Sequence, residues 1–315
     1  MKRILVTGSQ GQVGADLVPV LRQKYGNENV VGTIHKKMPS DKDGPYEKVD
    51  VMDKDQIVEV IKKYDIDTVF HLASVLSARG EKEPDLAWDL NVNSLKLILD
   101  IAKDHNLKIF WASSIAAFGP NTPRDNTPQM TVMDPNTMYG VTKVTGELLC
   151  NYYFQKFRVD VRGLRYPGLI SWKAPPGQGT TDYAVEIFYG ALKEKKYKCY
   201  LKEDTILPMM YMDDGIKATI EIMEADPSRI RNRMSYNLAA ISFTPKEIAQ
   251  EVKKHVPELE VTYEPDFRQK IADSWPKVIN DSAARKDWGW NHKFGLAEMT
   301  KVMLENLSRK LGVKS

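Results

Sequence analysis

Cysteine and paired histidine are scarce in this chain of 315 residues. The two cysteines, Cys150 and Cys199, are too few for a disulfide framework and do not have the spacing of metal ligands. The five histidines are scattered, and no two of them form a His-x-x-x-His pair. We therefore expect neither a disulfide-stabilised scaffold nor metal-dependent chemistry.

Long apolar runs and a strong excess of one charge are also lacking. No run approaches the roughly 20 apolar residues that span a bilayer, and residues 2–6 begin the chain without the apolar core of a signal peptide. The net charge is only +3, and we interpret the densest basic run, residues 193–198, as a solvated helix end. We expect a cytoplasmic protein that binds neither membrane nor nucleic acid.

What the sequence does contain is the composition of a soluble globular protein. Hydrophobic residues make up 42% of the chain and charged residues 28%. A chain of this length can form one large or two modest domains with a substantial core.

The first 25 residues have the order strand, glycine turn, helix. Residues 2–6 are short and apolar, glycines follow at positions 8, 11 and 14, and apolar residues then recur at helical spacing. Glycines let the backbone approach a pyrophosphate, and the first amide groups of a helix point at its negative charge. The turn predicts phosphate contacts from Gly8, Gln10, Gly11, Gln12, Val13 and Gly14.

A second stretch can supply a general base. Tyr139 and Lys143 stand four residues apart, which places both side chains on one face of a helix. A nearby ammonium favours the phenolate, which lowers the tyrosine pKa from its usual value of about 10. By itself the pattern also suits an ordinary surface pair. The glycine turn and the serine pair Ser113 and Ser114, which closes an apolar run, favour a catalytic role.

Together, the glycine turn, Ser114 and the Tyr139–Lys143 pair resemble the short-chain dehydrogenase/reductase superfamily, in its extended, epimerase-like branch. The resemblance implies an α/β fold with a Rossmann-type doubly wound parallel sheet over residues 1–170. Residues 171–315 should mainly form a smaller α/β substrate-binding lobe, with some later segments returning to the first domain. Since Ser, Tyr and Lys are the catalytic set in this family, Ser114, Tyr139 and Lys143 are the expected catalytic residues.

The resemblance also implies a bound dinucleotide. The second strand is expected at residues 29–34, and its end near Thr33 lacks the carboxylate that holds the ribose in many NAD enzymes. His35, Lys36 and Lys37 follow, so we expect NAD and leave NADP open. The further cofactor contacts implied by the family are Thr33, His35, Asp50, Val51, Leu72, Ala73, Asn91, Tyr139, Lys143, Tyr166, Pro167 and Ile170.

Three longer segments narrow the resemblance to the epimerase-like L-threonine 3-dehydrogenases: residues 164–170, 175–184 and 207–214. That likeness covers essentially the whole chain. It implies oxidation of the 3-hydroxyl of L-threonine to L-2-amino-3-oxobutanoate, with the hydride passing to NAD. The implied substrate contacts are Ser74, Ser114, Tyr139, Thr180, Thr181 and Asp182.

Roles can be assigned to these residues on chemical grounds. Tyr139 takes the hydroxyl proton, Lys143 lowers the tyrosine pKa, and Ser114 orients the hydroxyl and the developing carbonyl. Asp182 pairs with the substrate ammonium. As an alternative, Asp182 serves only as a cap of the helix that follows it. Glycines at 177 and 179 suggest a loop that closes over the substrate.

Two other functions remain open at this stage. A nucleotide-sugar 4-epimerase or dehydratase would use the same scaffold, and a regulator would bind the cofactor without turnover. The helix of Tyr139 and the helical segment 84–105 have longer apolar faces than one sheet requires. In the extended family these helices form a dimer interface, so we expect a homodimer; packing of these faces within one chain is the alternative.

Overall fold

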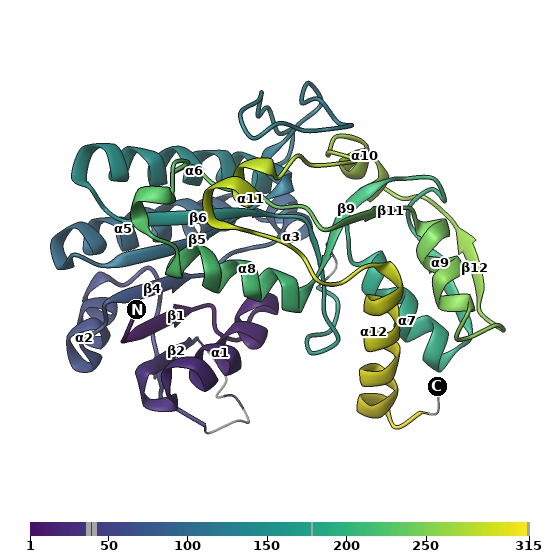
Figure 1. Ribbon diagram of the computed structural model, residues 1–315, viewed down its shortest axis with the longest axis horizontal. Helices are drawn as coiled ribbons and strands as arrows, with labels where there is room; N and C mark the ends of the chain where they lie inside the picture. The colour runs from purple at the N-terminus through teal and green to yellow at the C-terminus, as the bar shows by residue number, and fades with distance from the viewer. Residues whose placement is uncertain (36–38, 40–42, 178, 314–315) are drawn as a thin grey trace.

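The computed structural model describes residues 1–35, 39, 43–177 and 179–313. Its main feature is a seven-stranded sheet with the order β10-β6-β5-β4-β1-β2-β3, in which all paired strands are parallel (Figure 1). The strands are β1 (Ile4–Thr7), β2 (Val30–Ile34), β3 (Tyr46–Lys48), β4 (Thr68–His71), β5 (Lys108–Ser114), β6 (Val161–Tyr166) and β10 (Tyr236–Asn237). The order reverses between β1 and β4, so the expected α/β, doubly wound Rossmann-type sheet is confirmed.

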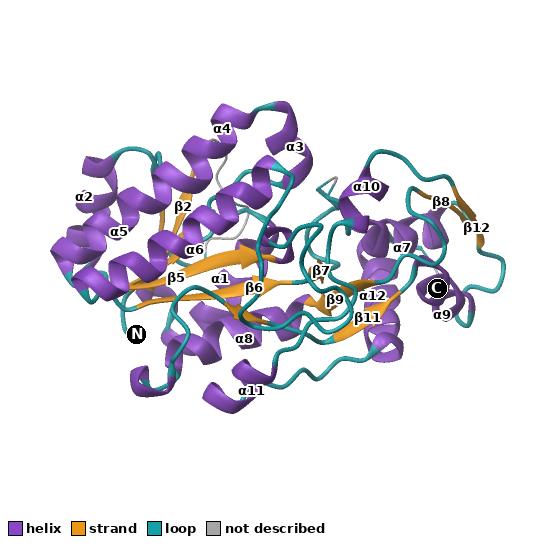
Figure 2. Cartoon of the chain, turned by 90° about the horizontal axis from the view of Figure 1, so that it is seen from above, coloured by secondary structure: helices purple, strands orange, loops and turns teal. Residues whose placement is uncertain are grey.

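Helices cover both faces of this sheet, and each face has its own apolar core (Figure 2). One face carries α1 (Gln12–Tyr25), α8 (Met212–Glu224) and α11 (Ser282–Trp288), and the other carries α2 (Lys54–Tyr64), α5 (Ser94–His105) and α6 (Met138–Phe157). Successive side chains of β1 serve the two cores in turn, since Ile4 packs on the first and Leu5 on the second. This explains why the strands are apolar throughout.

The connections over the carboxyl edge of the sheet also follow the sequence pattern. The predicted helical segment 84–105 is present as α4 (Pro84–Trp88), a π-helical turn (Asp89–Asn93) and α5. The short helix α3 (Ser77–Lys82) precedes it, and single 3₁₀ turns occur at Asn27–Asn29, Ile115–Ala117 and Pro227–Arg229. The proline-rich residues 120–135 form a loop, with one isolated β-bridge from Thr127 to Ile279.

The second half of the chain forms most of a smaller lobe. It contains a three-stranded sheet of β7 (Gly168–Ile170), β9 (Leu207–Tyr211) and β11 (Ile241–Phe243), and a pair of β8 (Lys196–Cys199) with β12 (Glu260–Tyr263). Its helices are α7 (Tyr183–Lys193), α9 (Pro245–Lys253), α10 (Arg268–Asp273) and α12 (Leu296–Leu311). Since β10, α8 and α11 join the first sheet, the chain crosses between the two parts several times, and a boundary at residue 170 stays a prediction.

One sequence interpretation in this lobe was wrong. We expected residues 193–198 to be a helix end, but only Lys193 ends a helix, and residues from Lys196 onward form β8 against β12. Along β8 the exposed side chains of Lys196 and Lys198 alternate with the less exposed Tyr197 and Cys199. A basic segment can therefore form a strand at the lobe surface, because successive side chains point to opposite faces. Among the described residues, no helix is long and apolar enough to cross a membrane.

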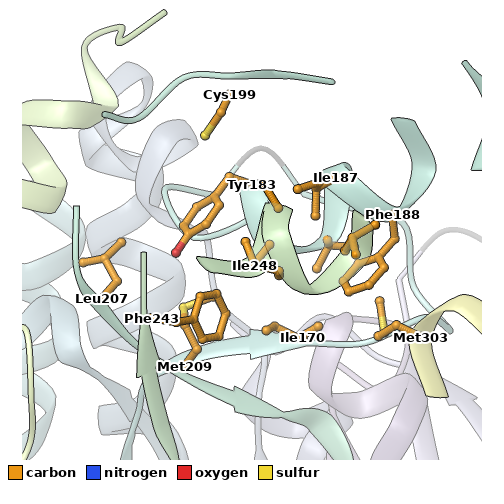
Figure 3. Packing of buried hydrophobic residues seen from close by; sticks show 14 of the residues in the cluster. Ile170, Tyr183, Ile187, Phe188, Cys199, Leu207, Met209, Phe243, Ile248 and Met303 are labelled. Carbon is orange, nitrogen blue, oxygen red and sulfur yellow. The ribbon is translucent and has the colours of Figure 1, made fainter. Parts of the chain in front are cut away.

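Tyr183 is an unusual member of the lobe core. Its side chain is fully buried, and its hydroxyl points toward Leu207 and Phe243 (Figure 3). Within the described part of the chain, that hydroxyl has no hydrogen-bond partner. A buried hydroxyl without a partner costs roughly 1–3 kcal/mol of desolvation free energy.

Replacing Tyr183 by Phe should therefore stabilise the protein. We expect Tyr183→Phe to raise the free energy of unfolding by about 1 kcal/mol and the Tm by roughly 2 °C, because the ring stays while the unpaired hydroxyl is removed. Differential scanning calorimetry measures both. The matched control is Tyr236→Phe, whose equally buried hydroxyl accepts from the amide of Arg231 and donates to Asp287, at 2.9 and 2.7 Å. The control should lower Tm, and a lower Tm for Tyr183→Phe would contradict the interpretation.

Candidate active site

A cavity of about 240 Å³ opens at the carboxyl ends of β1, β4, β5 and β6. It therefore lies where the strand order reverses, the usual ligand position in an open α/β sheet. Residues from the smaller lobe close its other side. The lining residues predicted from the sequence are Gly8, Gly11, Gln12, Val13, Gly14, Leu72, Ser74, Ser114, Tyr139, Lys143, Tyr166, Pro167, Thr180, Thr181 and Asp182.

The glycine turn forms one end of this cavity. Gly8 has a φ of +67°, and a Cβ there would lie 2.7 Å from the backbone nitrogen of Ala73. A Cβ at Gly14 would overlap the carbonyl oxygen of Gly8, so both positions require glycine. Helix α1, which the structure describes in full, starts at Gln12. It has no side-chain hydrogen bond at its N-cap and no acidic residue in its first turn. Its first amide groups are thus left for an anionic ligand, and the turn fits a pyrophosphate.

Three consecutive residues at the end of β5 contact successive turns of α6. Ser114 lies beside Tyr139 and lowers its pKa, the carbonyl of Ala112 accepts from Lys143 Nζ at 2.7 Å, and Ser113 donates to Glu147 at 2.6 Å. Helix α6 begins just before Tyr139, because the hydroxyl of Thr137 caps it by accepting from the amide of Gly140. The strand and the helix thereby bring the predicted catalytic residues Ser114, Tyr139 and Lys143 to one wall of the cavity.

The electrostatics of this wall correct one expectation. We expected Lys143 to lower the pKa of Tyr139, but desolvation raises the pKa of Tyr139 to about 12, and the hydrogen bond with Ser114 offsets only part of the rise. Burial lowers the pKa of the Lys143 ammonium to about 7, and Glu147 opposes that change. In the protein alone, Lys143 Nζ lies 5.2 Å from the centre of the Tyr139 ring and donates to a backbone carbonyl. Desolvation therefore outweighs the ammonium as the influence on the phenol.

Asp182 lies at the opposite wall. It is only 5% exposed, and its Oδ2 accepts from the backbone nitrogen of Gly179 at 2.8 Å. Asp182 is the N-cap residue of α7, as the alternative expected, but its side chain makes no capping hydrogen bond to that helix. The carboxylate instead orders the turn before the helix, and Tyr200 supports the same turn by donating to the carbonyl of Gly179 at 3.1 Å. Asp182 thus provides a buried negative charge across the cavity from Tyr139.

A second hollow contains two more of the predicted cofactor residues. His35 and Asp50 line it together with Lys48, Val49 and Gln56. His35 follows β2 and Asp50 follows β3, which are one and two strands from β1 and its glycine turn along the same carboxyl edge. The prediction about Lys36 and Lys37 lies outside the described residues.

The remaining predicted cofactor residues lie outside both hollows: Gln10, Thr33, Val51, Ala73, Asn91 and Ile170. Asn91 is buried and supports a lining residue, because its Oδ1 accepts from the hydroxyl of Ser74 at 3.0 Å. Ile170 packs in the lobe core, while its neighbour Leu169 lines the cavity. Successive strand residues point to opposite faces, which is why Leu169 lines the cavity and Ile170 does not; the cofactor contact at Ile170 stays a prediction.

Sequence reasoning missed several residues of the cavity. The lining residues that were not predicted are Leu76, Ser77, Ala112, Ser113, Ile115, Gly168, Leu169, Gly179 and Trp275. Strand alternation could have identified Leu169. Trp275 carried no signal, because it follows α10 in an irregular segment and is held by Arg124, whose Nε donates to its carbonyl at 2.8 Å. Only tertiary contacts bring that segment to the site.

Comparisons with known proteins agree with this geometry. The model of the family described as the NAD dependent epimerase/dehydratase family matches residues 4–239. An uncharacterised epimerase/dehydratase of Staphylococcus haemolyticus is 48% identical over 314 residues, covering 98% of this chain and 99% of that protein.

Two solved structures are also similar. The X-ray structure of L-threonine dehydrogenase from Clostridium difficile is 50% identical, with a TM-score of 0.96 and 98% of both chains covered. A monomeric L-threonine 3-dehydrogenase from a metagenome is 47% identical, with a TM-score of 0.94, covering 98% of this chain and 99% of that one.

Proposed function

The chain belongs to the NAD dependent epimerase/dehydratase family, and from that premise we propose that it is an L-threonine 3-dehydrogenase. The reaction is oxidation of the 3-hydroxyl of L-threonine to L-2-amino-3-oxobutanoate. One observation carries the proposal: Ser114, Tyr139 and the buried Asp182 line the same cavity. An amino alcohol has a hydroxyl for the first wall and an ammonium for the second. The similar solved structures of threonine dehydrogenases support this choice.

The expected cofactor is NAD, which supplies the hydride acceptor when bound. The glycine turn from Gly8 to Gly14 would hold its pyrophosphate, and the hollow beside His35 and Asp50 would receive the adenosine end. Tyr166 and Pro167, at the end of β6, would border the nicotinamide end. The contacts at Asn91 and Ile170 would then be indirect.

The chain's own residues perform the proton chemistry. Tyr139 accepts the hydroxyl proton of the substrate as a phenolate, so the site must lower the high pKa of the phenol when it is loaded. The Lys143 ammonium, one helical turn away, favours that phenolate. Ser114 donates to the substrate oxygen and keeps it in line with Tyr139. Asp182 holds the substrate ammonium, and Ser74 and Thr180 are the proposed partners of its carboxylate.

The first test is the reaction itself with Tyr139→Phe. Purified protein is mixed with L-threonine and NAD, then with NADP, and the absorbance of the reduced cofactor is followed. We expect turnover by the wild type and a loss of at least about 10³-fold in kcat for the variant, since the base is removed. The control is Tyr263→Phe in β12, which lies outside the cavity lining, and full activity is expected.

The same experiment separates the alternatives. Interconversion of UDP-sugars without net reduction of the cofactor would select the epimerase. Cofactor binding with no turnover of either substrate would select the regulator.

Asp182→Asn tests the second wall. The amide keeps the acceptor for the backbone of Gly179 but removes the charge that pairs with the substrate ammonium. We expect KM for L-threonine to rise about 10- to 100-fold while kcat changes little, because a charge-assisted hydrogen bond is worth about 1.5–3 kcal/mol. The internal control is 3-hydroxybutanoate, which lacks the ammonium. Equal losses with both substrates would show that Asp182 acts only on the loop.

We also propose a homodimer formed through α6. This helix carries large apolar side chains that are partly exposed: Val141, Leu148, Tyr152 and Phe157. Trp88 of α4 is exposed as well, and exposed apolar surface of this kind can mark an interaction site. The similar metagenomic dehydrogenase is described as monomeric, so the state has to be measured.

Light scattering of the wild type and of Leu148→Glu provides that measurement. We expect a mass of twice 35.8 kDa for the wild type and a shift toward 35.8 kDa for the variant, because a charge replaces an apolar contact. The control is Val132→Glu, an exposed apolar residue of the proline-rich loop, which should not change the mass. A wild-type mass of a single chain would contradict the dimer.

A further inference from the structure

A fully buried ion pair lies beneath the candidate active site. Glu147 of α6 has no exposed surface and Arg165 of β6 is 1% exposed. Arg165 donates to both carboxylate oxygens of Glu147, from Nε at 2.8 Å and from Nη2 at 2.7 Å. Removing two charges from water is costly, so such a pair is weak evidence for a role in stability alone.

Neighbouring residues supply further hydrogen bonds to both members of the ion pair. Ser113, Arg165 and Asn237 are neighbours in register across β5, β6 and β10. Ser113 donates to Glu147 Oε1 at 2.6 Å, while Arg165 Nη1 donates to Asn237 Oδ1 and to the carbonyl of Gln129, both at 2.9 Å. The carboxylate therefore has one fixed position relative to the sheet.

That position is tied to the catalytic wall through α6. Glu147 is one turn beyond Lys143, and Lys143 is one turn beyond Tyr139. The contacts of these three residues come from Ser113, Ala112 and Ser114, which are consecutive in β5. Helix α6 lies along β5 and β6 (Figure 2). Among these three residues, only Glu147 also binds a side chain of a second strand, Arg165 of β6.

Few charged groups face Lys143 from the elements around it. On its own helix, Glu147 and Cys150 raise its pKa, while burial lowers it to about 7. From β4, His71 faces it, but burial lowers the pKa of His71 to about 3, so this ring is neutral. From β5 the neighbours are the ring of Trp111, whose centre is 4.8 Å from Nζ, and the carbonyl of Ala112. The carboxylate of Glu147 is thus the main group among the described residues that favours the ammonium.

We propose that Glu147 is a positioning residue of the active site: held by Arg165 and Ser113, it fixes α6 against β5 and sustains the ammonium of Lys143 beside Tyr139. The inference rests on the proposed dehydrogenase function for its catalytic consequence. Its electrostatic part concerns the protein alone.

The test uses Glu147→Gln, which keeps the shape of the side chain and removes its charge. The pKa of Lys143 should fall, and the coupled pair of Tyr139 and Lys143 should lose its first proton more readily. In the pH profile of kcat/KM for L-threonine, we expect the acidic limb to move about one unit lower. The plateau should fall about tenfold, because less of the pair exists as ammonium and phenolate.

The matched control is Asp160→Asn at the opposite end of β6. Asp160 also holds buried arginines, Arg162 and Arg233, at 2.9 and 2.6 Å, but it lies far along the strand from the cavity. We expect both variants to lower Tm, and only Glu147→Gln to move the pH profile. A lower Tm with an unchanged profile for Glu147→Gln would overturn the proposal, as would an equal shift in the control.

A direct titration of Lys143 separates this inference from the proposed function. The protein is labelled with ¹³Cε-lysine, and the Lys143 signal is identified by its absence in Lys143→Met. In the wild type it should titrate near neutral pH, and in Glu147→Gln about one unit lower. This result is independent of any substrate, so an absence of threonine oxidation would refute the function and not the inference.

If Glu147→Gln does not fold, it is combined with Arg165→Met, so that no unpaired charge stays buried. The double variant should shift the Lys143 titration in the same direction, because the carboxylate that favours the ammonium is removed. An unchanged titration would overturn the proposal.

Discussion

The packing of the end of β5 against the first turns of α6 is the contact on which the site depends. Ala112, Ser113 and Ser114 are consecutive in the strand, and each meets a different turn of the helix, at Lys143, Glu147 and Tyr139. A parallel strand inside the sheet and a 20-residue helix on its face are rigid elements. Tyr139, Ser114 and Lys143 therefore hold their relative positions without a ligand, while turns and loops form other parts of the cavity lining.

The rest of the fold supplies that cavity with its two other walls. The reversal of strand order between β1 and β4 opens the edge where the glycine turn presents the free amide groups of α1. After β7 the chain enters the smaller lobe, and the turn before α7 returns Asp182 to the cavity, stabilised by the amide of Gly179. The proposed base and the proposed partner of the substrate ammonium thus come from different parts of the chain. This division explains how one family scaffold can serve several reactions.

Local patterns predicted what local physics determines. The glycine turn after β1 and the placement of Tyr139 and Lys143 on one helix depend on backbone geometry within a few residues. Both were predicted. The pKa of Tyr139 could not be predicted, because it depends on desolvation by groups distant in the sequence. Trp275 was missed for the same reason, since a hydrogen bond from Arg124 brings an irregular segment to the cavity. Ile170 shows a third limit: a correct strand still leaves open which of two neighbouring side chains faces the ligand.

In the proposed reaction, the hydroxyl-bearing carbon of L-threonine meets the cofactor at the wall formed by Ser114, Tyr139 and Lys143. Isotope transfer tests this most directly. L-Threonine deuterated at C3 is oxidised with NAD, and the reduced cofactor is isolated and examined by NMR. The account predicts one deuterium per molecule at C4 of the nicotinamide, on a single face of the ring. Reduced cofactor without deuterium, or no reduced cofactor at all, would contradict it.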